Sequence, residues 1–398
     1  MTTRVCFIGG ARYGRPLDAT SEKKFRALKA LGDLYIVGFS KTLRPRRYSE
    51  HARLYLMPNV PVSMLRYLEV FTVGTAIVCW LVARHGVNVV VTQSPYEGLA
   101  GAAAKKIAEW FGYRVCLVVE NHGDFEESVF LQRRVVFSGL YRFLMQRVAC
   151  FSLGHADLLR AISTSTRKQL ERWVPEKSIT QFPTWTDIDA FLQAGAGPER
   201  RSSQDIVYVG VLIPRKGVHH LIAAFGDVAS DFPGARLVIV GSEDNKSYAS
   251  GLKRQAKALG LEGRVLFMDT MAQAKLAVRM GKSRVCVLPS ASEALGRVVI
   301  EAMATYTPVI GSNVGGIPDM VKDGESGFLV PPGDETVLAE KIRWILNHPE
   351  EAKAMGCKGR AFAEQFFSTE AYVSGYRRIF EAARALTLRE GGLASSTL

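Results

Sequence analysis

The sequence lacks the features that mark secreted, disulfide-bonded and membrane-spanning proteins. Its six cysteines are scattered without a C-x-x-C pair, and a strand-like VCFI stands where a secretory signal would have its apolar core. An uncharged apolar run, residues 70–83, has 14 residues, fewer than the ~20 that cross a bilayer. We therefore expect a cytoplasmic protein in which this run forms a buried or interfacial helix and not a span.

Motifs of nucleic-acid binding and of dinucleotide binding are also missing. The chain has no helix-turn-helix, zinc-finger or RNP-like pattern, so we expect no nucleic-acid partner. The first strand-like run ends in Gly9 and Gly10, but Ala11 takes the place of the second glycine of the fingerprint G-x-G-x-x-G, which argues against a nicotinamide enzyme. The two glycines still let a ligand approach the backbone, and a plain strand-to-helix turn is the alternative.

Positive charge is abundant, and it is concentrated in the first half of the chain. The net charge is +13, and residues 1–190 carry 26 Lys and Arg against 16 Asp and Glu, a balance of +10. Such a surface suits anionic lipid headgroups or a phosphorylated substrate as well as nucleic acid.

The composition and the pattern of apolar runs indicate two α/β domains. Hydrophobic residues make up 47% of the 398 residues and charged residues 22%, as in folded soluble chains. Short β-rich runs alternate with helical periodicity, which predicts doubly wound parallel sheets. The pattern stops at a stretch rich in Gly, Ala and Pro and then restarts. The expected segments are a Rossmann-like domain (1–190), a linker (191–203), a second Rossmann-like domain (204–366), a helix returning to the first domain (367–388) and a flexible tail (389–398).

Two doubly wound domains that face each other would form a cleft between the carboxyl ends of their strands, the default place for a ligand. The second domain opens with YVGVLIPRKGVHH, a strand followed by a loop that ends in Lys216 and Gly217. A lysine there offers a point charge to a diphosphate, above all beside a helix N-terminus. A solvated surface lysine is the alternative for an isolated R-K-G.

The stretch SASEALGRVVIEA supplies such a helix start after the strand-like VCVLPS, with Leu295, Gly296 and Arg297 expected in its first turn. Glu293 precedes the helix and Glu301 lies inside it. If both were helical they would lie about 80° apart, so they are not an acid/base pair. Two carboxylates on either side of a phosphate-binding helix start can instead accept hydrogen bonds from two sets of hydroxyls, which fits a nucleotide-sugar.

This block, with the AMATYTPVIGSNVGGIPDMVKDGESGFLVPPGD that follows it, resembles the nucleotide-sugar-binding half of retaining family 4 glycosyltransferases (glycosyl transferases group 1). The Gly-Gly loop, HGDFE, ADLLRAISTSTRKQL and VGVLIPRKG extend the resemblance over most of the chain. It implies the GT-B architecture, with an acceptor-binding first domain, a donor-binding second domain and a C-terminal helix that crosses back. It also implies metal-independent hexosyl transfer, with no cofactor besides a nucleotide-diphosphate-sugar co-substrate.

The resemblance also assigns roles to residues of the second domain. Glu301 matches the residue that binds the ribose hydroxyls of the donor, and Glu293 the one that contacts the hydroxyls of the transferred sugar. Lys216 matches the lysine that compensates the diphosphate, and the amides of Leu295 and Gly296 would cap that diphosphate.

Two residues of the first domain match the family pattern. His122, in ENHGD, corresponds to the histidine at the reaction centre that touches the donor sugar, and Gly10 to a glycine loop near the phosphates. A capped loop histidine is the alternative for His122. The expected catalytic residues are thus His122, Glu293 and Lys216.

The chain departs from the family at the start of the second domain, where Val211 replaces an arginine that normally pairs with the lysine. The loss removes a charge-assisted contact of ~1.5–3 kcal/mol. Arg215 and Arg297 adjoin the same anion site and are the candidate replacements, and the sequence leaves open whether either serves.

Asp187 and Asp189 mimic the D-x-D motif that holds a divalent ion in metal-dependent glycosyltransferases. They stand in a loop before the linker, and Lys216 with the helix dipole already accounts for charge neutralisation. We expect no metal.

The acceptor is less clearly indicated. Residues 64–83 and 129–151 are apolar and aromatic with interspersed arginines, as in proteins that rest on a bilayer. Buried helices of a large domain are the alternative, since Arg133 and Arg142 would face opposite sides of a helix. A glycan or lipid-linked acceptor of surface polysaccharide or glycolipid synthesis, reached at the cytoplasmic face of the membrane, is the expectation. The oligomeric state, the base and the sugar are left open.

Two other functions are compatible with the sequence. The valine at position 211 would suit a catalytically silent nucleotide-sugar-binding scaffold, and the GT-B architecture also occurs in sugar epimerases. A phosphorylase would need a lysine-bound pyridoxal cofactor and a much longer chain.

Overall fold

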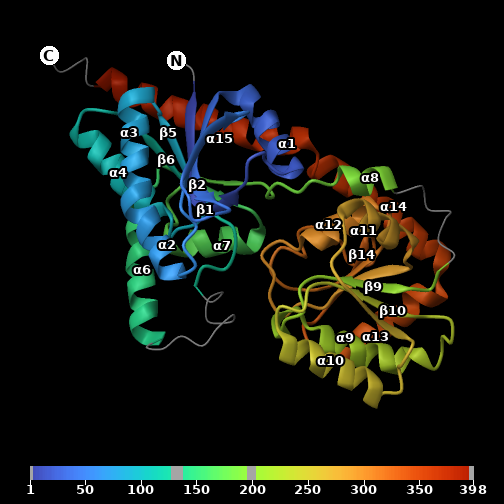
Figure 1. Cartoon of the computed structure of the whole chain (residues 1–398). Helices are drawn as coiled ribbons and strands as arrows, with labels where there is room; N and C mark the ends of the chain where they lie inside the picture. Colours follow the sequence, from blue (N-terminus) through green and yellow to red (C-terminus); the bar gives the residue numbers. More distant parts are fainter. Residues whose placement is uncertain (1–2, 127–137, 195–202, 394–398) are drawn as a thin grey trace. The chain divides into compact units, whose positions relative to one another are not determined.

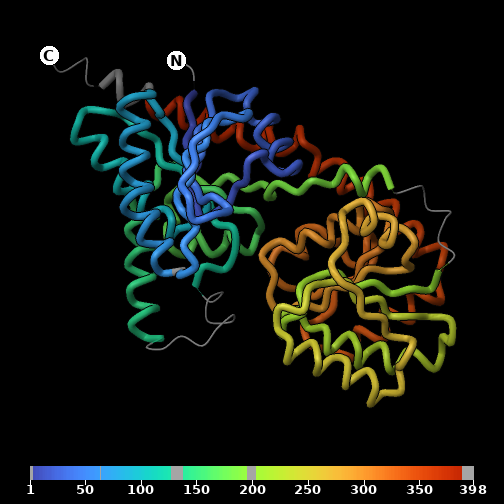
Figure 2. The backbone as a smooth tube through the Cα atoms, in the orientation of Figure 1, coloured from blue at the N-terminus to red at the C-terminus, as the bar shows by residue number. Residues whose placement is uncertain are grey.

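The structure is a computed structural model that describes residues 3–126, 138–194 and 203–393. The chain divides into two compact units. The first unit contains Met1–Trp185 and Thr369–Leu398, and the second contains Thr186–Ser368. Figure 2 traces the chain through both of them, from the blue N-terminus to the red C-terminal helix.

The first unit is built on an eight-stranded sheet whose order is β3-β4-β2-β1-β5-β6-β7-β8. Neighbouring strands run parallel except for the edge strand β3, which pairs with β4 antiparallel. The strands are β1 (Arg4–Tyr13), β2 (Asp33–Ser40), β3 (Arg46–Glu50), β4 (Ala52–Met57), β5 (Val89–Thr92), β6 (Cys116–Asn121), β7 (Leu158–Ala161) and β8 (Ile179–Gln181).

Helices cover both faces of this sheet (Figure 1). One hydrophobic cluster joins the sheet to α3, α4, α6 and α7, and a second joins its other face to α1 and α15. The helices are α1 (Ala19–Leu28), α2 (Ser63–Glu69), α3 (Thr75–His85), α4 (Gly98–Trp110), α6 (Ser138–His155), α7 (Thr164–Trp173) and α15 (Thr369–Leu393), with short turns Lys29–Leu31 and Val70–Gly74.

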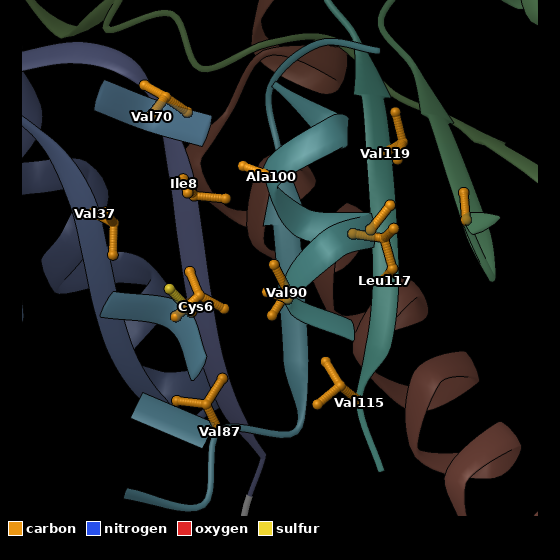
Figure 3. Packing of buried hydrophobic residues seen from close by; sticks show 14 of the residues in the cluster. Cys6, Ile8, Val37, Val70, Val87, Val90, Ala100, Val115, Leu117 and Val119 are labelled. Carbon is orange, nitrogen blue, oxygen red and sulfur yellow. The ribbon is translucent and has the colours of Figure 1, made fainter. Parts of the chain in front are cut away.

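Central strands of the sheet carry long apolar runs because both of their faces are covered. On β1, Cys6 and Ile8 belong to the first cluster, whereas Val5 and Phe7 belong to the second. Figure 3 shows this packing, with side chains of neighbouring strands close to Ala100 of α4. The apolar runs recognised in the sequence are therefore buried parallel strands.

The second unit holds a six-stranded sheet of order β11-β10-β9-β12-β13-β14, and all of its neighbouring strands are parallel. Helices α9, α10 and α13 lie on one face and α8, α11, α12 and α14 on the other (Figure 1). The strands are β9 (Ile206–Val209), β10 (Leu237–Val240), β11 (Val265–Met268), β12 (Val285–Leu288), β13 (Val309–Ser312) and β14 (Gly327–Val330). The helices are α8 (Asp189–Ala194), α9 (Val218–Ala229), α10 (Lys246–Ala258), α11 (Gln273–Lys282), α12 (Arg297–Ala304), α13 (Glu335–Asn347) and α14 (Pro349–Phe366).

The expected segment limits and the structural ones differ in two places. The second unit already begins at Thr186, and the start of the expected linker is helical, because α8 buries Phe191 and packs against α11 and α12. Helix α15 runs to Leu393, so residues 389–393 of the expected tail are helical. Residues 195–202 of the linker and 394–398 of the tail lie outside the described residues.

One helix is longer than its uncharged run suggested. Met64–His85, which comprises α2, a π-helical turn and α3, has 22 residues and a mean hydropathy of 1.5, and by length and composition alone it is sufficient to cross a membrane. The uncharged run is shorter than the helix because Glu69 bounds it on one side and Arg84 on the other. A core helix of a soluble protein meets the same test, and Val78, Leu81 and Val82 of this helix belong to the core of the first unit.

Candidate functional site

In the second unit, the expected donor-binding residues come from two loops at the middle of the sheet and from the start of α12. Strand β9 lies beside β12, and the connections from these strands lead in opposite directions along the sheet. Ligands of doubly wound sheets bind at such a switch point, outside the carboxyl ends of the strands. The loop after β9 carries Arg215 and Lys216, and the loop after β12 leads through Glu293 into α12.

Lys216 and Glu293, expected to bind the diphosphate and the sugar, contact each other directly. The Lys216 ammonium donates a hydrogen bond to the Glu293 carboxylate, and the two side chains are 14% and 13% exposed. Ser290 Oγ donates to the same carboxylate oxygen at 3.4 Å. The two side chains already neutralise each other. A bound donor would therefore either bind Lys216 while it stays bonded to Glu293 or break that ion pair.

Two glycines allow the loops to approach this closely. At Gly217, with φ of 66°, a Cβ atom would lie 2.0 Å from the carbonyl oxygen of Pro289. At Gly315, with φ of 59°, it would lie 1.5 Å from the carbonyl oxygen of Glu293. Gly315 belongs to the GG of the motif and was not expected in the site. It places a third loop, after β13, against the backbone of Glu293.

Helix α12 begins at Arg297, two residues later than expected. Gly296 is the residue before the helix, with φ of 88°, and its carbonyl accepts a hydrogen bond from Val299 N–H at 2.8 Å. Leu295 lies outside the helix with a buried side chain. A Cβ on Gly296 would come within 3.4 Å of Glu293 Cγ, so the start of α12 adjoins the Lys216–Glu293 pair. The amides at a helix start are suited to bind an anion.

Glu301 lies in the second turn of α12 and is 11% exposed. Burial raises the pKa of its carboxyl to about 7, although Arg297 opposes the shift. A guanidinium nitrogen of Arg297 is 4.0 Å from Glu301 Oε1, and Arg297 is about half exposed. Arg297, a candidate replacement for the arginine missing at position 211, is thus placed beside the carboxylate expected to bind ribose.

Arg215, the other candidate, joins the two loops. Its Nη1 donates to the carbonyl of Ser292 at 3.1 Å, and its own carbonyl accepts from Ala291 N–H at 2.9 Å. Among the described residues its buried Nε has no hydrogen-bond partner. Val211 contributes only a carbonyl, which accepts from Tyr208 Oη at 3.2 Å.

The switch point of the first sheet lies between β1 and β5, and Gly10 stands there. Its N–H donates to Glu97 Oε1 at 2.6 Å. Burial raises the pKa of Glu97 to about 7, against the opposing effect of the Gly10 hydrogen bond. The amide expected near a phosphate is thus already bonded to a carboxyl group. Gly10 lies inside β1, which continues to Tyr13 and does not end at the glycine pair as expected. Glu97, four residues after the strand-like NVVVTQ, was missed in the sequence.

His122 lies just after β6 and is held by Glu120. The His122 Nε2 and Glu120 Oε2 are 2.6 Å apart, and Glu120 is fully buried, whereas His122 is 31% exposed. Burial lowers the pKa of His122, although Glu120 opposes the shift. A neutral His122 that donates from Nε2 has Nδ1 left as a hydrogen-bond acceptor. Such an atom can accept a hydrogen bond from a sugar hydroxyl.

Behind His122, the Glu120 carboxylate has two further donors. Arg160 Nη1 donates to Glu120 Oε1 at 2.8 Å and Tyr376 Oη to the same atom at 2.5 Å. Burial alone would raise the pKa of Glu120, but Arg160, His122 and Tyr376 outweigh it and hold that pKa well below the usual range. Neither Arg160 nor Tyr376 was singled out in the sequence, because 40 and 256 residues separate them from Glu120.

A pocket of about 410 Å³ opens in the first unit among the loops after β5 and β6 and helices α6 and α7. It is lined by Tyr96, Asp124, Phe125, Glu126, Arg142, Met145, Gln146, Ala149, Arg172 and Trp173. Aromatic rings and both signs of charge are therefore available two residues along the chain from His122.

Within the described part of the chain, no group of three or more His, Cys, Asp and Glu side chains is arranged to hold a metal ion. In the D-x-D sequence, the N–H of Asp189 donates to Asp187 Oδ1 at 3.4 Å. The expectation that the protein needs no metal stays a prediction.

Comparisons with known proteins concern the family of the second domain and the fold of the chain. A family model for glycosyl transferases group 1 matches residues 195–362. The D-inositol 3-phosphate glycosyltransferase of Segniliparus rotundus is 36% identical over 194 residues, which are 48% of this chain and 42% of that protein. The chain spans about half the length of the curated relatives it matches.

Solved structures are similar over nearly the whole chain. Sucrose-phosphate synthase from Thermosynechococcus elongatus matches 96% of this chain and 100% of its own, with a TM-score of 0.74 and 24% identity. The Anabaena protein HepE in complex with UDP matches 96% and 100%, with a TM-score of 0.71 and 21% identity. These likenesses confirm the expected GT-B architecture. Residues 195–362 are therefore a domain of the glycosyl transferases group 1 family, carried by a chain with the GT-B fold.

Proposed function

We propose that the protein is a retaining, metal-independent glycosyltransferase that moves a hexose-type sugar from a nucleotide-diphosphate-sugar to a glycan or lipid-linked acceptor. The observation that carries this proposal is the arrangement of Lys216, Glu293 and Glu301 around the start of α12, at the switch point of a group 1 domain. A structural neighbour holds UDP, which supports a nucleotide as part of the ligand.

Each group has one task on the donor. Lys216, the start of α12 and Arg215 or Arg297 stabilise the diphosphate, Glu301 accepts from the ribose hydroxyls and Glu293 from those of the sugar. His122 accepts from another sugar hydroxyl through Nδ1. The glycine pair at Gly10 lies near the donor phosphates, and the Gly10 amide is hydrogen-bonded to Glu97.

Retention needs no strong base on the protein. The acceptor hydroxyl attacks the anomeric carbon on the face from which the diphosphate leaves, and its proton passes to the departing phosphate oxygen. The rate then depends on positioning and on stabilising the charge of the leaving group. The absence of an acid/base pair from the proposed roles follows from this mechanism.

The acceptor has a suitable place in the pocket beside the His122 loop. The rings of Tyr96, Phe125 and Trp173 line this pocket together with the carboxylates of Asp124 and Glu126, and sugar sites commonly combine rings with polar groups. We place the reaction in polysaccharide or glycolipid synthesis, at the cytoplasmic face of the membrane.

The helix layer α2, α3 and α6 supports a membrane surface as a partner. Leu65, Leu68, Val73 and Trp80 are each more than 40% exposed on the long apolar helix. On α6, the guanidinium carbon of Arg147 lies 5.0 Å from the centre of the exposed Phe143 ring. Apolar side chains beside cations are typical of surfaces that bind anionic bilayers. Residues 129–137 of the second expected segment lie outside the described residues.

Co-sedimentation with vesicles tests the membrane proposal. We expect binding to vesicles that contain anionic lipid, weakened by salt and by Leu68→Ser. Leu259→Ser, which changes an exposed leucine of the second unit, is the matched control and should bind as the wild type does. No binding at low salt would rule the proposal out.

Thermal-shift screening against UDP-, GDP- and ADP-sugars, followed by transfer assays with acceptor extracts, tests the central proposal. A donor at 100 times its Kd stabilises the protein by ~2.7 kcal/mol. Lys216→Ala should lower transfer at least ~100-fold without unfolding the protein. The control Lys257→Ala changes an exposed lysine of the same unit and should leave the rate of transfer unchanged. Full activity of Lys216→Ala would contradict the assignment.

A silent nucleotide-sugar-binding scaffold is the second candidate, favoured by Val211. If the protein is such a scaffold, a nucleotide-sugar should raise its unfolding temperature, but neither transfer nor hydrolysis of the donor should be detected. A sugar epimerase would instead release a free or isomerised sugar, which chromatography of the products separates from a glycoside.

A further inference from the structure

A fully buried cluster of charged groups stands behind His122 in the first unit. Arg160 is 0% exposed and Glu120 is 1% exposed, and Tyr376 is buried with them. Taking two opposite charges out of water is costly unless their hydrogen bonds are satisfied, so such a pair is weak evidence for stability and calls for another role. The geometry of the cluster indicates that role.

Glu120 joins three parts of the chain. One carboxylate oxygen binds His122 Nε2 at 2.6 Å, and the other accepts from Arg160 at 2.8 Å and Tyr376 at 2.5 Å. Arg160 Nη1 also lies 2.9 Å from Tyr376 Oη, which closes a triangle of hydrogen bonds. The carboxylate cannot shift toward or away from His122 without disturbing the other two partners.

Arg160 connects this triangle to the first crossing, residues 182–186, where the chain leaves the first unit after Trp185. Its Nη2 donates to the carbonyl oxygens of Pro183 at 2.8 Å and Phe182 at 3.4 Å. Its guanidinium carbon stands 3.9 Å from the centre of the Phe182 ring. Two hydrogen bonds from one nitrogen and one cation–π contact therefore hold the crossing to Arg160.

Tyr376 connects the triangle to the second crossing, residues 368–376, where the chain re-enters the first unit and begins α15. The ring of Tyr376 lies 5.2 Å from that of Phe182, and Tyr372 lies 5.2 Å from Trp185. Gly375 provides the room, since a Cβ there would be 2.6 Å from the Phe182 ring. The two crossings thus pack on each other over the buried cluster.

We propose that Glu120, Arg160 and Tyr376 are a positioning relay, which fixes the ring and the tautomer of His122 and makes them depend on both crossings between the units. The relay rests on the proposed function only in so far as His122 touches the donor sugar. None of the three residues needs to contact a substrate. A neutral His122 held through Nε2–H keeps Nδ1 as the acceptor, and a loosened Glu120 would let the ring rotate or exchange tautomers.

Tyr376→Phe is the most conservative test of the relay, because it removes one hydroxyl and retains the packed ring. We expect kcat for transfer to fall about 10-fold while KM for the donor changes less than about twofold. The matched control is Tyr372→Phe in the same aromatic cluster, whose hydroxyl is not among the described donors to Glu120 and whose kcat should be unchanged. Arg160→Lys and Glu120→Gln are less informative because either can unfold the protein.

The ¹⁵N signals of the His122 ring give a readout that does not need activity. In the wild type they should show the Nε2–H tautomer, assigned with the help of His122→Asn, and in Tyr376→Phe they should shift toward the other tautomer or broaden. Unchanged ring signals, or an unchanged kcat, in Tyr376→Phe would overturn the relay. A wild type that transfers no sugar would count against the proposed function instead, and the ring signals would then decide the relay alone.

Discussion

At the residue scale, the candidate site is built from charged groups that partner one another across long stretches of sequence. Lys216 and Glu293 are 77 residues apart and form an ion pair, whereas Glu301 is a buried carboxyl whose pKa is raised to about 7. These groups differ in what a ligand must do to them. A ligand has to share Lys216 with Glu293, because the two already form an ion pair. It binds the carboxyl of Glu301 best when that carboxyl is ionised.

The raised pKa of Glu301 predicts that donor affinity depends on pH. Ribose hydroxyls donate more strongly to a carboxylate than to a carboxylic acid. We expect Kd for the donor to rise as the pH falls below about 7, approaching about 10-fold per pH unit. Calorimetry between pH 8 and pH 5.5 measures it. Glu301→Gln should bind weakly with little pH dependence, and a flat wild-type profile would contradict the role of Glu301.

The same carboxyl should weaken the fold at high pH. A pKa raised on folding means that its stabilising contribution is complete below the ordinary value of 4.5 and is lost as the pH rises through about 7. Glu301→Gln should therefore unfold at a higher temperature than the wild type at pH 8, and the gain should vanish near pH 4.5. Thermal unfolding at the two pH values decides this.

At the element scale, loops and helices approach each other where glycines permit it. The sequence predicted the alternation of strands and helices, the loops that carry the expected site residues and a helix start at residues 295–297, because apolar runs and motif spacing are local signals. It did not predict Glu97 or the role of Gly315. Their partners, Gly10 and Glu293, are 87 and 22 residues away, and such pairs become visible only once the sheet order is known.

Gly315 offers a test of the loop that supports Glu293. Gly315→Ala combines a left-handed backbone with a Cβ placed 1.5 Å from a carbonyl oxygen, and we expect a loss of more than ~3 kcal/mol or of donor binding. Gly324→Ala is the control, because its φ of 73° is as positive but nothing lies within 4 Å, so it should cost only ~1 kcal/mol. Denaturant unfolding compares them, and equal losses would contradict the contact.

Gly375 offers a similar test for the packing of α15. Gly375→Ala forces a methyl group against Phe182 and should destabilise the protein by ~1–3 kcal/mol. Gly154→Ala in α6 meets open space and should stabilise it by up to ~1 kcal/mol. Chemical denaturation of both variants gives the sign, and a stabilising Gly375→Ala would show that the helix sits farther from Phe182.

At the scale of the whole molecule, the first unit is completed by the last described helix. Tyr372, Tyr376, Ile379, Phe380 and Ala383 of α15 are buried in its second hydrophobic cluster. The sequence predicted that a C-terminal helix returns to the first domain, but it could not show which side chains enter the core or that Tyr376 reaches Glu120. That contact depends on the helix's rotation about its axis, which an amphipathic pattern fixes only coarsely.

Removal of α15 after Ser368 should leave the second unit folded and the first unfolded. The five buried residues contribute on the order of 10 kcal/mol, comparable to the ~5–15 kcal/mol of a whole domain. Calorimetry of the truncated protein should show a single transition that still responds to the donor nucleotide. Two transitions, as in a protein with both units folded, would contradict this account.

The position of α15 in the chain also sets an order of events during synthesis. A ribosome delivers residues 186–368 before the helix that closes the first unit, so the second unit can fold while the earlier one still waits for its final element. Until then the groove that receives Tyr372, Tyr376 and Ile379 is open to solvent and to chaperones. The nascent chain can place His122 only after α15 has emerged.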